Sequence, residues 1–79
     1  MNETDLLVLK AIYEATEAQL DKTVQVQHEV FPRLKGLGQG TAALSIKTLH
    51  KHGYVKHSGN AFSQVELLEA GKLLLEKQR

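Results

Sequence analysis

Apolar residues recur at helical spacing between residues 41 and 55, and the rest of the chain is organised around this stretch. Three of them stand at positions i, i+4 and i+7: Ala42, Ile46 and Leu49. This spacing places their side chains on one face of a helix. The pattern therefore predicts a helix over about residues 40–52.

Both ends of this helix carry recognisable signals. Thr41, or Gln39 just before it, is expected to cap the first turn through its side chain. Gly53 suits a left-handed stop because glycine has no Cβ to clash. With Gly53 as the first residue after the cap, Leu49 and Tyr54 are expected to touch in a Schellman ending.

The opposite face of the helix is small, polar and basic, and it holds no acid. Its residues are Gly40, Ala43, Leu44, Lys47, Thr48 and Lys51. Two cations, a hydroxyl and small side chains form a face that can enter a DNA groove. The apolar Leu44 leaves three explanations open: it reads a thymine methyl, contacts a protein, or belongs to the core.

A second helix is predicted over residues 3–20, with Asn2 as its cap and Asp5 as the partner in a capping box. Its apolar residues form two stripes. The first comprises Leu6, Leu9, Ile12, Tyr13, Thr16 and Leu20, and the second Leu7 or Val8, Ala11, Ala15 and Ala18. A helix with two apolar faces is buried on two sides. One side is expected to meet the core, and the other a C-terminal helix or a second subunit.

Between these two helices, alternating apolar and polar residues predict a short strand at about residues 22–25. A helix is then predicted from about residue 26, because the apolar spacing becomes helical through Val26, Val30 and Leu34. Pro32 lacks an N–H and disfavours α geometry at Phe31, so this helix is expected to break at Phe31 or to kink. Phe31 itself is expected to fill the core.

The segment from Gly36 to Gly40 favours a tight turn between two helices, with Leu37 pointing inward. A phosphate-binding loop is the weaker interpretation, because the spacing is GxGxG instead of GxGxxG and no lysine follows Gly40.

Downstream of the central helix, residues 54–57 and 61–67 flank a Ser-Gly-Asn turn, which predicts a β-hairpin. A last helix is predicted over residues 68–78. Apolar residues there exceed what one small core needs: Leu67, Leu68, Ala70, Leu73, Leu74 and Leu75. A second copy of the chain explains the excess most simply, and packing of both faces on the first helix is the alternative.

Composition narrows the class of protein. The 79 residues suit one small domain, predicted to be α+β and mostly helical. No cysteine is present, which excludes disulfides and cysteine-ligated zinc. No apolar run approaches the roughly 18 residues of a membrane span. The acidic start is unlike a signal peptide, so a cytoplasmic protein is expected.

Charge is distributed unevenly, although the formal net charge is only +1. Residues 1–21 hold five acids and one lysine. Residues 22–65 hold six cations and a single acid, together with all four histidines. One basic face is typical of a protein that binds a polyanion, and an uneven but ordinary solvated surface is the alternative.

Three stretches together resemble a winged helix-turn-helix domain. Residues 28–37, beginning His-Glu-Val, look like the first helix and turn of the helix-turn-helix. TAALSIKTLHKHGYV, residues 41–55, is similar to the recognition helix and its glycine-marked exit into the wing. VELLEAGK, residues 65–72, is similar to the end of the wing and the start of the last helix in small MarR- and PadR-like regulators. Leu68 stands where those families usually show a threonine, which removes the expected helix cap.

The resemblance implies a three-helix core, a wing over about residues 54–66 and an extra C-terminal helix. It also implies a transcriptional repressor that binds double-stranded DNA sequence-specifically, with the recognition helix in the major groove, as a homodimer through its first and last helices. By position, the expected DNA-binding residues are Gln39, Thr41, Ala43, Leu44, Lys47, Thr48 and Lys51 on the recognition helix, Lys56, His57 and Asn60 on the wing, and Arg33 and Lys35 before the helix.

Roles can be assigned to some of these side chains. Gln39 is expected to pair with adenine, and Thr41 or Leu44 to touch a thymine methyl. Lys47 and Lys51 are expected to contact phosphates, because a lysine ammonium group is a point charge and lacks the paired donors of an arginine guanidinium group. Each of the expected contacts has the alternative of an ordinary solvated side chain.

Other functions have less support. Winged helices also serve as protein-interaction modules, and this is the alternative function. A metal held by His50 and His52, with His57 nearby, is not expected, because residues two apart on a helix point about 200° away from each other. Neither a catalytic set nor a cofactor is indicated, so the chain is not expected to be an enzyme.

Overall fold

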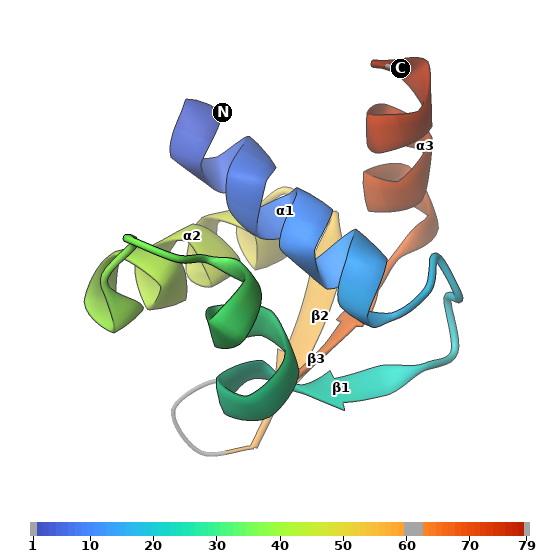
Figure 1. Cartoon of the computed structure of the whole chain (residues 1–79). Coiled ribbons are helices and arrows are strands. Elements are labelled where there is room, and N and C mark those ends of the chain that lie inside the picture. Colours follow the sequence, from blue (N-terminus) through green and yellow to red (C-terminus); the bar gives the residue numbers. More distant parts are fainter. Residues whose placement is uncertain (1, 60–62, 79) are drawn as a thin grey trace.

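The computed structural model describes residues 2–59 and 63–78 and has the α+β, mostly helical architecture that the sequence predicts (Figure 1). In chain order its elements are α1 (Glu3–Ala15), β1 (Thr23–Gln25), the π-helix η1 (Val26–Val30), the 3₁₀-helix η2 (Phe31–Arg33), α2 (Gln39–Lys51), β2 (Val55–Ser58), β3 (Gln64–Leu67) and α3 (Glu69–Lys77). The β2–β3 hairpin points away from the end of the molecule where both chain termini lie.

The three strands form an antiparallel sheet in the order β1-β3-β2, so the last strand lies in the centre. Val24 pairs with Val65, and Val55 pairs with Leu67, and all four of these side chains are buried. The predicted strand over 61–67 is observed as Gln64–Leu67, and its first two residues lie outside the described part of the chain.

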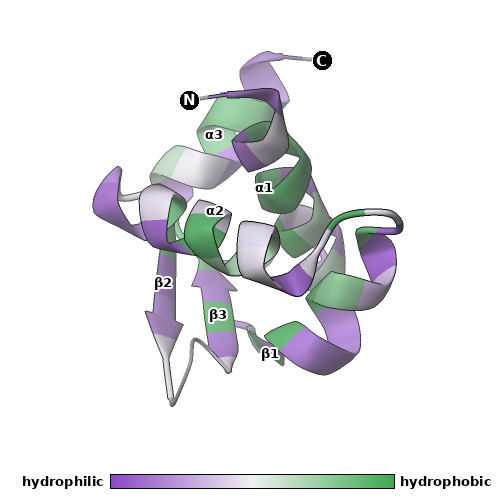
Figure 2. Ribbon diagram, turned by 90° about the vertical axis from the view of Figure 1, so that its left-hand side faces the viewer, coloured by the Kyte–Doolittle hydropathy of each residue, from purple (hydrophilic) through white to green (hydrophobic). Residues whose placement is uncertain are grey.

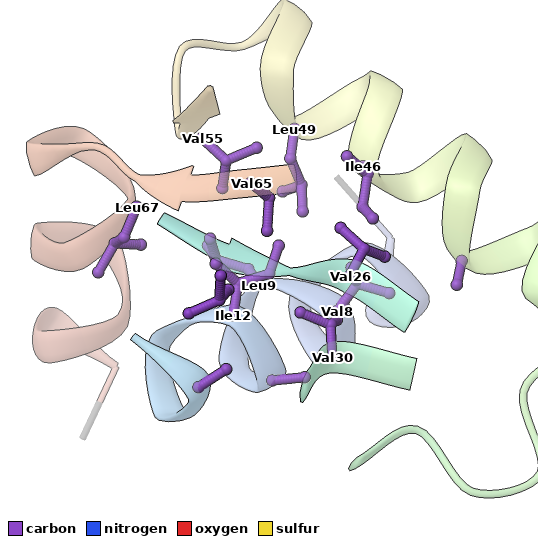
Figure 3. Packing of buried hydrophobic residues seen from close by; sticks show 14 of the residues in the cluster. Val8, Leu9, Ile12, Val26, Val30, Ile46, Leu49, Val55, Val65 and Leu67 are labelled. Atoms are coloured by element: carbon purple, nitrogen blue, oxygen red, sulfur yellow. The ribbon is translucent and has the colours of Figure 1, made fainter. Parts of the chain in front are cut away.

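The core lies between the sheet and the helices α1 and α2 (Figure 3). Leu9 and Ile12 of α1, together with Ile46 and Leu49 of α2, have no exposed surface. Val26, Val30 and Leu34 are buried as their spacing predicts. Phe31 and Leu37 are only half-buried and pack against the edge of this cluster. The expectation that Phe31 fills the core is therefore met in part.

The first helix begins as predicted and ends earlier than predicted. The Asn2 side chain accepts from the Asp5 N–H at 2.8 Å, and the Asp5 carboxylate accepts from the Asn2 N–H, which forms the capping box. Instead of continuing to residue 20, α1 ends at Ala15. Glu17 and Ala18 adopt left-handed φ values of 56° and 60°, and the Ala18 N–H donates to the Tyr13 carbonyl.

Pro32 determines the form of the second helical segment. Beyond its first turn an α-helix uses the N–H of every residue, and Pro32 has none. The Phe31 N–H donates to the Val26 carbonyl, five residues back, so the segment opens as a π turn. It closes as a 3₁₀ turn in which the Leu34 N–H donates to the Phe31 carbonyl. The helix type changes at Phe31, near the predicted break or kink, but Phe31 itself keeps right-handed helical geometry with φ −59° and ψ −40°, so the expectation is met in part.

The central helix ends as predicted and starts differently. The Gly53 N–H donates to His50 and the Tyr54 N–H to Leu49, with Gly53 at φ 78°, which is the predicted Schellman ending. The N-cap is Gly38, with no side-chain hydrogen bond, so the expectation of a cap from Thr41 or Gln39 was wrong. The backbone of Gly38 is extended, and helical geometry begins directly after it at Gln39.

Candidate nucleic-acid interface

The helix α2 has one buried face and one exposed face. Ala42, Ser45, Ile46 and Leu49 are buried against α1 and the sheet. The opposite face presents Leu44 at 68% exposure, with Lys47 and Lys51 also exposed. Of the three explanations for Leu44, membership of the core was wrong, because its side chain points to solvent. Figure 2 shows α2 crossing the molecule beside the hydrophilic strand β2.

Leu44 and Thr48 lie side by side on this exposed face, Leu44 exposed and Thr48 half-buried, and we call this pair the apolar stripe. Leu44 and Thr48 stand at i and i+4, so their side chains are neighbours on the helix surface. The Thr48 hydroxyl donates to the Leu44 carbonyl at 3.1 Å. This bond uses the hydroxyl hydrogen within the helix, and it leaves the methyl group and the oxygen lone pairs for a partner.

The remaining predicted residues lie at the start of α2 and on neighbouring elements. Gln39 and Thr41 are exposed in the first turn of α2. On β2, Lys56 is exposed and His57 is half-buried. Asn60 lies outside the described residues.

Arg33 and Lys35 are exposed in the segment before α2. The Arg33 Nε donates to the Glu29 carbonyl at 2.9 Å, so one edge of its guanidinium group is occupied by its own helical segment. That bond satisfies a carbonyl in the distorted segment around Pro32, which gives Arg33 a structural role besides the predicted phosphate contact.

A pocket of about 560 Å³ opens beside the start of α2, and sequence reasoning missed it. It is lined by residues of β1, η1, η2, α2 and β3 together with the residue before β3: Gln25, Val26, Gln27, His28, Phe31, Gln39, Gly40, Ala43, Ser63 and Gln64. Four glutamines and no Lys, Arg, Asp or Glu stand among these lining residues. The alternation of Gln25 and Gln27 with buried valines was the only signal of this amide-rich wall.

The histidines gather where α2 meets β2, but in a different pairing from the one considered from the sequence. The rings of His50 and His57 lie 4.2 Å apart between centroids, tilted by 58°. His52 instead stacks on Tyr54 at 6.0 Å. Burial lowers the pKa of His57, and the positive charge of His50 lowers it further. Within the described residues no three His, Cys, Asp or Glu side chains gather as a metal site.

The helices α1 and α3 pack against each other and form a second surface, which we call the α1/α3 face. Leu73 is 49% exposed, and Leu74 and Leu75 are half-buried. The Tyr13 hydroxyl donates to the Glu76 carboxylate at 3.2 Å and joins the two helices. Packing of α3 on the same chain therefore accounts for part of its apolar surface and leaves Leu73 uncovered.

In the described part of the chain, no helix is both long enough and apolar enough to cross a lipid bilayer. Comparison of the sequence with protein-family models and with curated proteins, and of the fold with solved structures, found no match in any of the three.

Proposed function

We propose that this chain is a winged helix-turn-helix protein that binds double-stranded DNA sequence-specifically and acts as a small transcriptional repressor. The order of α1, β1, the η1–η2 segment, α2, the β2–β3 hairpin and α3 supports this assignment. The sheet supports it too: β2 and β3 form an antiparallel hairpin at one edge, and β2 contacts α2, as expected of a wing. In such domains the recognition helix enters the major groove and the wing lies along the backbone or minor groove.

The observation that carries the proposal is the exposed face of α2. Lys47 and Lys51 lie one turn apart on it. Lys56 is exposed on β2, where the strand register places it opposite Glu66 of β3. The acids of the chain are concentrated elsewhere, with Glu3 and Glu14 exposed on α1. A polyanion approaching α2 therefore meets cations and hydroxyls, while the acids of α1 lie on another element.

Repression by occupancy needs two half-sites, and we propose that a homodimer supplies them. The α1/α3 face is the candidate interface, because Leu73 is uncovered there. Two copies joined through these helices would place their α2 helices at half-sites about one helical turn of DNA apart.

Fluorescence anisotropy with a mixed-sequence duplex at several salt concentrations tests the proposal. Each phosphate neutralised by Lys or Arg contributes about −0.9 to the slope of log K against log salt. We expect binding with a slope of several units. Affinity weaker than about 10⁻⁴ M at low salt, without a slope, would refute DNA binding.

A paired variant locates the surface. Lys47→Gln with Lys51→Gln is expected to reduce the magnitude of the slope by about 2 per bound copy, because two phosphate contacts are lost. Lys22→Gln removes one cation from the segment between α1 and β1, outside α2 and outside the helices of the proposed dimer, and serves as the control. An equal change in both variants would contradict the assignment of the interface to α2.

A protein-interaction module is the second candidate function, and the exposure of Leu44 favours it. A large apolar side chain surrounded by lysines resembles the anchor of a protein interface. This function would be preferred if the chain showed no salt-dependent binding to duplex DNA.

A further inference from the structure

We infer that the half-site read by α2 is built of A·T pairs, with Leu44 and Thr48 contacting thymine methyl groups and Gln39 contacting adenine. This inference rests on the proposed DNA binding and specifies which sequences the surface accepts. It follows from the apolar stripe, from the position of the amides and from the arrangement of the basic side chains.

The side chains of the apolar stripe are suited to recognise a thymine methyl group by direct contact. In the major groove the thymine methyl is the apolar group that the bases present, and aliphatic side chains recognise it by contact. Leu44 is 68% exposed at the centre of the face, so a methyl group can reach it without any rearrangement of the core. Thr48, one turn later, donates its hydroxyl hydrogen to the Leu44 carbonyl and offers its methyl beside that of Leu44.

The basic side chains fit phosphates better than guanine. Guanine is most often read by the two-pronged guanidinium of arginine, and the chain has only Arg33 and Arg79. Arg33 lies on η2 and donates its Nε to the Glu29 carbonyl, and Arg79 lies outside the described residues. Lys47 and Lys51 follow Leu44 at i+3 and i+7 on the same exposed side of α2, and as point charges they suit contact with the DNA backbone.

The amide side chain of Gln39 is the group that we expect to recognise adenine. A glutamine amide can bond to both N6 and N7 of adenine. Gln39 is the first residue of α2, and recognition helices contact base edges through their N-terminal residues. It also lines the uncharged, amide-rich pocket, so no lysine or arginine of the described lining competes for the same base.

The test begins with selection of bound sequences from random duplex DNA by the full chain. The selected half-site is expected to be rich in A·T. In that site each thymine is then replaced by uracil, which removes one methyl group and leaves base pairing intact. At the thymine that contacts Leu44, we expect the replacement to lower the affinity roughly fourfold, which corresponds to the free energy of burying one methyl group.

Leu44→Ala distinguishes direct contact from a general effect on the duplex. This variant is expected to bind the thymine and uracil duplexes equally, because the partner of the methyl is gone. Leu7→Ala removes the same atoms from an α1 leucine that is 53% exposed, and it is expected to keep the full fourfold difference.

Three outcomes overturn the inference. These are a selected half-site rich in G·C, a wild-type protein insensitive to uracil at every position, and a Leu44→Ala variant that retains the thymine preference. In each of these the protein still binds DNA with a salt slope, so the proposed function stands. Absence of any binding with a salt slope removes both the proposed function and the inference.

Discussion

At the scale of single residues, Gly71 is the position most sensitive to one added methyl group. A Cβ built there would collide with the carbonyl oxygen of Tyr54 and come within 3.2 Å of a Leu9 methyl. The same carbonyl accepts from the Leu68 N–H, so it is held in place. Gly71→Ala is expected to lower the free energy of unfolding by about 1–3 kcal/mol, the usual cost of overpacking. Urea denaturation measures it.

Gly40→Ala is the matched control for this substitution. No heavy atom lies within 4 Å of a Cβ built at Gly40, which stands in the first turn of α2. Alanine restricts the unfolded chain and suits a helix, so this variant is expected to gain about 0.5–1 kcal/mol. Equal effects of the two substitutions would contradict the close approach of α3 to Tyr54.

His57 predicts a pH dependence of stability. Burial, followed by the charge of His50, lowers its pKa below the ordinary value of 6.5. Between the folded and unfolded pKa values the unfolded chain binds more protons, so stability rises with pH in this window. We therefore expect the free energy of unfolding to decline as pH falls from about 7.5 through 6.5 toward 5, measured by urea denaturation.

His57→Gln should remove part of this decline, whereas His28→Gln, at an exposed position on η1, should preserve it. A wild-type profile that is flat over this range, or one that His57→Gln leaves unaltered, would show that His57 does not contribute.

At the scale of elements, α1 and α2 end with the same hydrogen-bond pattern but with different residues. At α2 the left-handed position is Gly53, whereas at α1 the left-handed residues are Glu17 and Ala18. A left-handed conformation costs an L-residue about 1–2 kcal/mol, and glycine avoids most of it. Ala18→Gly is expected to raise the free energy of unfolding by about 0.5–1 kcal/mol and leaves the Lys22–Glu17 ion pair in place.

Thermal unfolding followed by circular dichroism measures this change. Gly53→Ala places an alanine at the left-handed position of α2, which corresponds to Glu17 of α1. It is expected to be destabilised by at least the amount that Ala18→Gly gains, because it introduces the strain that Gly53 avoids. If Ala18→Gly is less stable than the wild type, packing of its half-buried methyl outweighs the backbone strain.

The helix ends also explain where sequence reasoning succeeded and where it failed. The end of α2 was predictable from the sequence because a glycine at this position indicates a left-handed residue that ends a helix. The end of α1 could not, because Thr16 and Leu20 continue the apolar spacing beyond it. Burial of those side chains is compatible with a helix and with the observed turn, so periodicity alone does not distinguish them.

The candidate site was predictable to a similar extent. One helix carries most of it, so the exposed face of α2 followed from helical spacing once Ala42, Ile46 and Leu49 were assigned to the core. The pocket beside it joins Gln25, Gln39 and Gln64, which come from three separate elements. Contacts between residues so far apart in sequence depend on the sheet register and the path around Pro32, and neither follows from local pattern.

At the scale of the whole molecule, two apolar surfaces serve the two proposed kinds of contact. The stripe around Leu44 lies on α2, and the α1/α3 face around Leu73 lies on other elements. Because different elements carry them, each surface can be altered by a single substitution. Dimerisation and DNA binding, the two proposed properties, can therefore be tested independently with one set of variants.

Leu73→Glu is expected to convert a dimer into a monomer, since a carboxylate cannot be buried unpaired at an apolar interface. Sedimentation equilibrium measures the mass of the protein, and anisotropy with duplexes carrying one or two half-sites measures its cooperativity. The wild type should gain affinity on two half-sites through effective concentration, and Leu73→Glu should lose that gain while it keeps the affinity for a single half-site.

Leu44→Glu places the same charge on the other surface, so it should remain a dimer and lose DNA binding. A wild type that sediments as a monomer at every concentration, or a Leu73→Glu protein that stays dimeric, would assign the exposed apolar surface of α3 to some other contact.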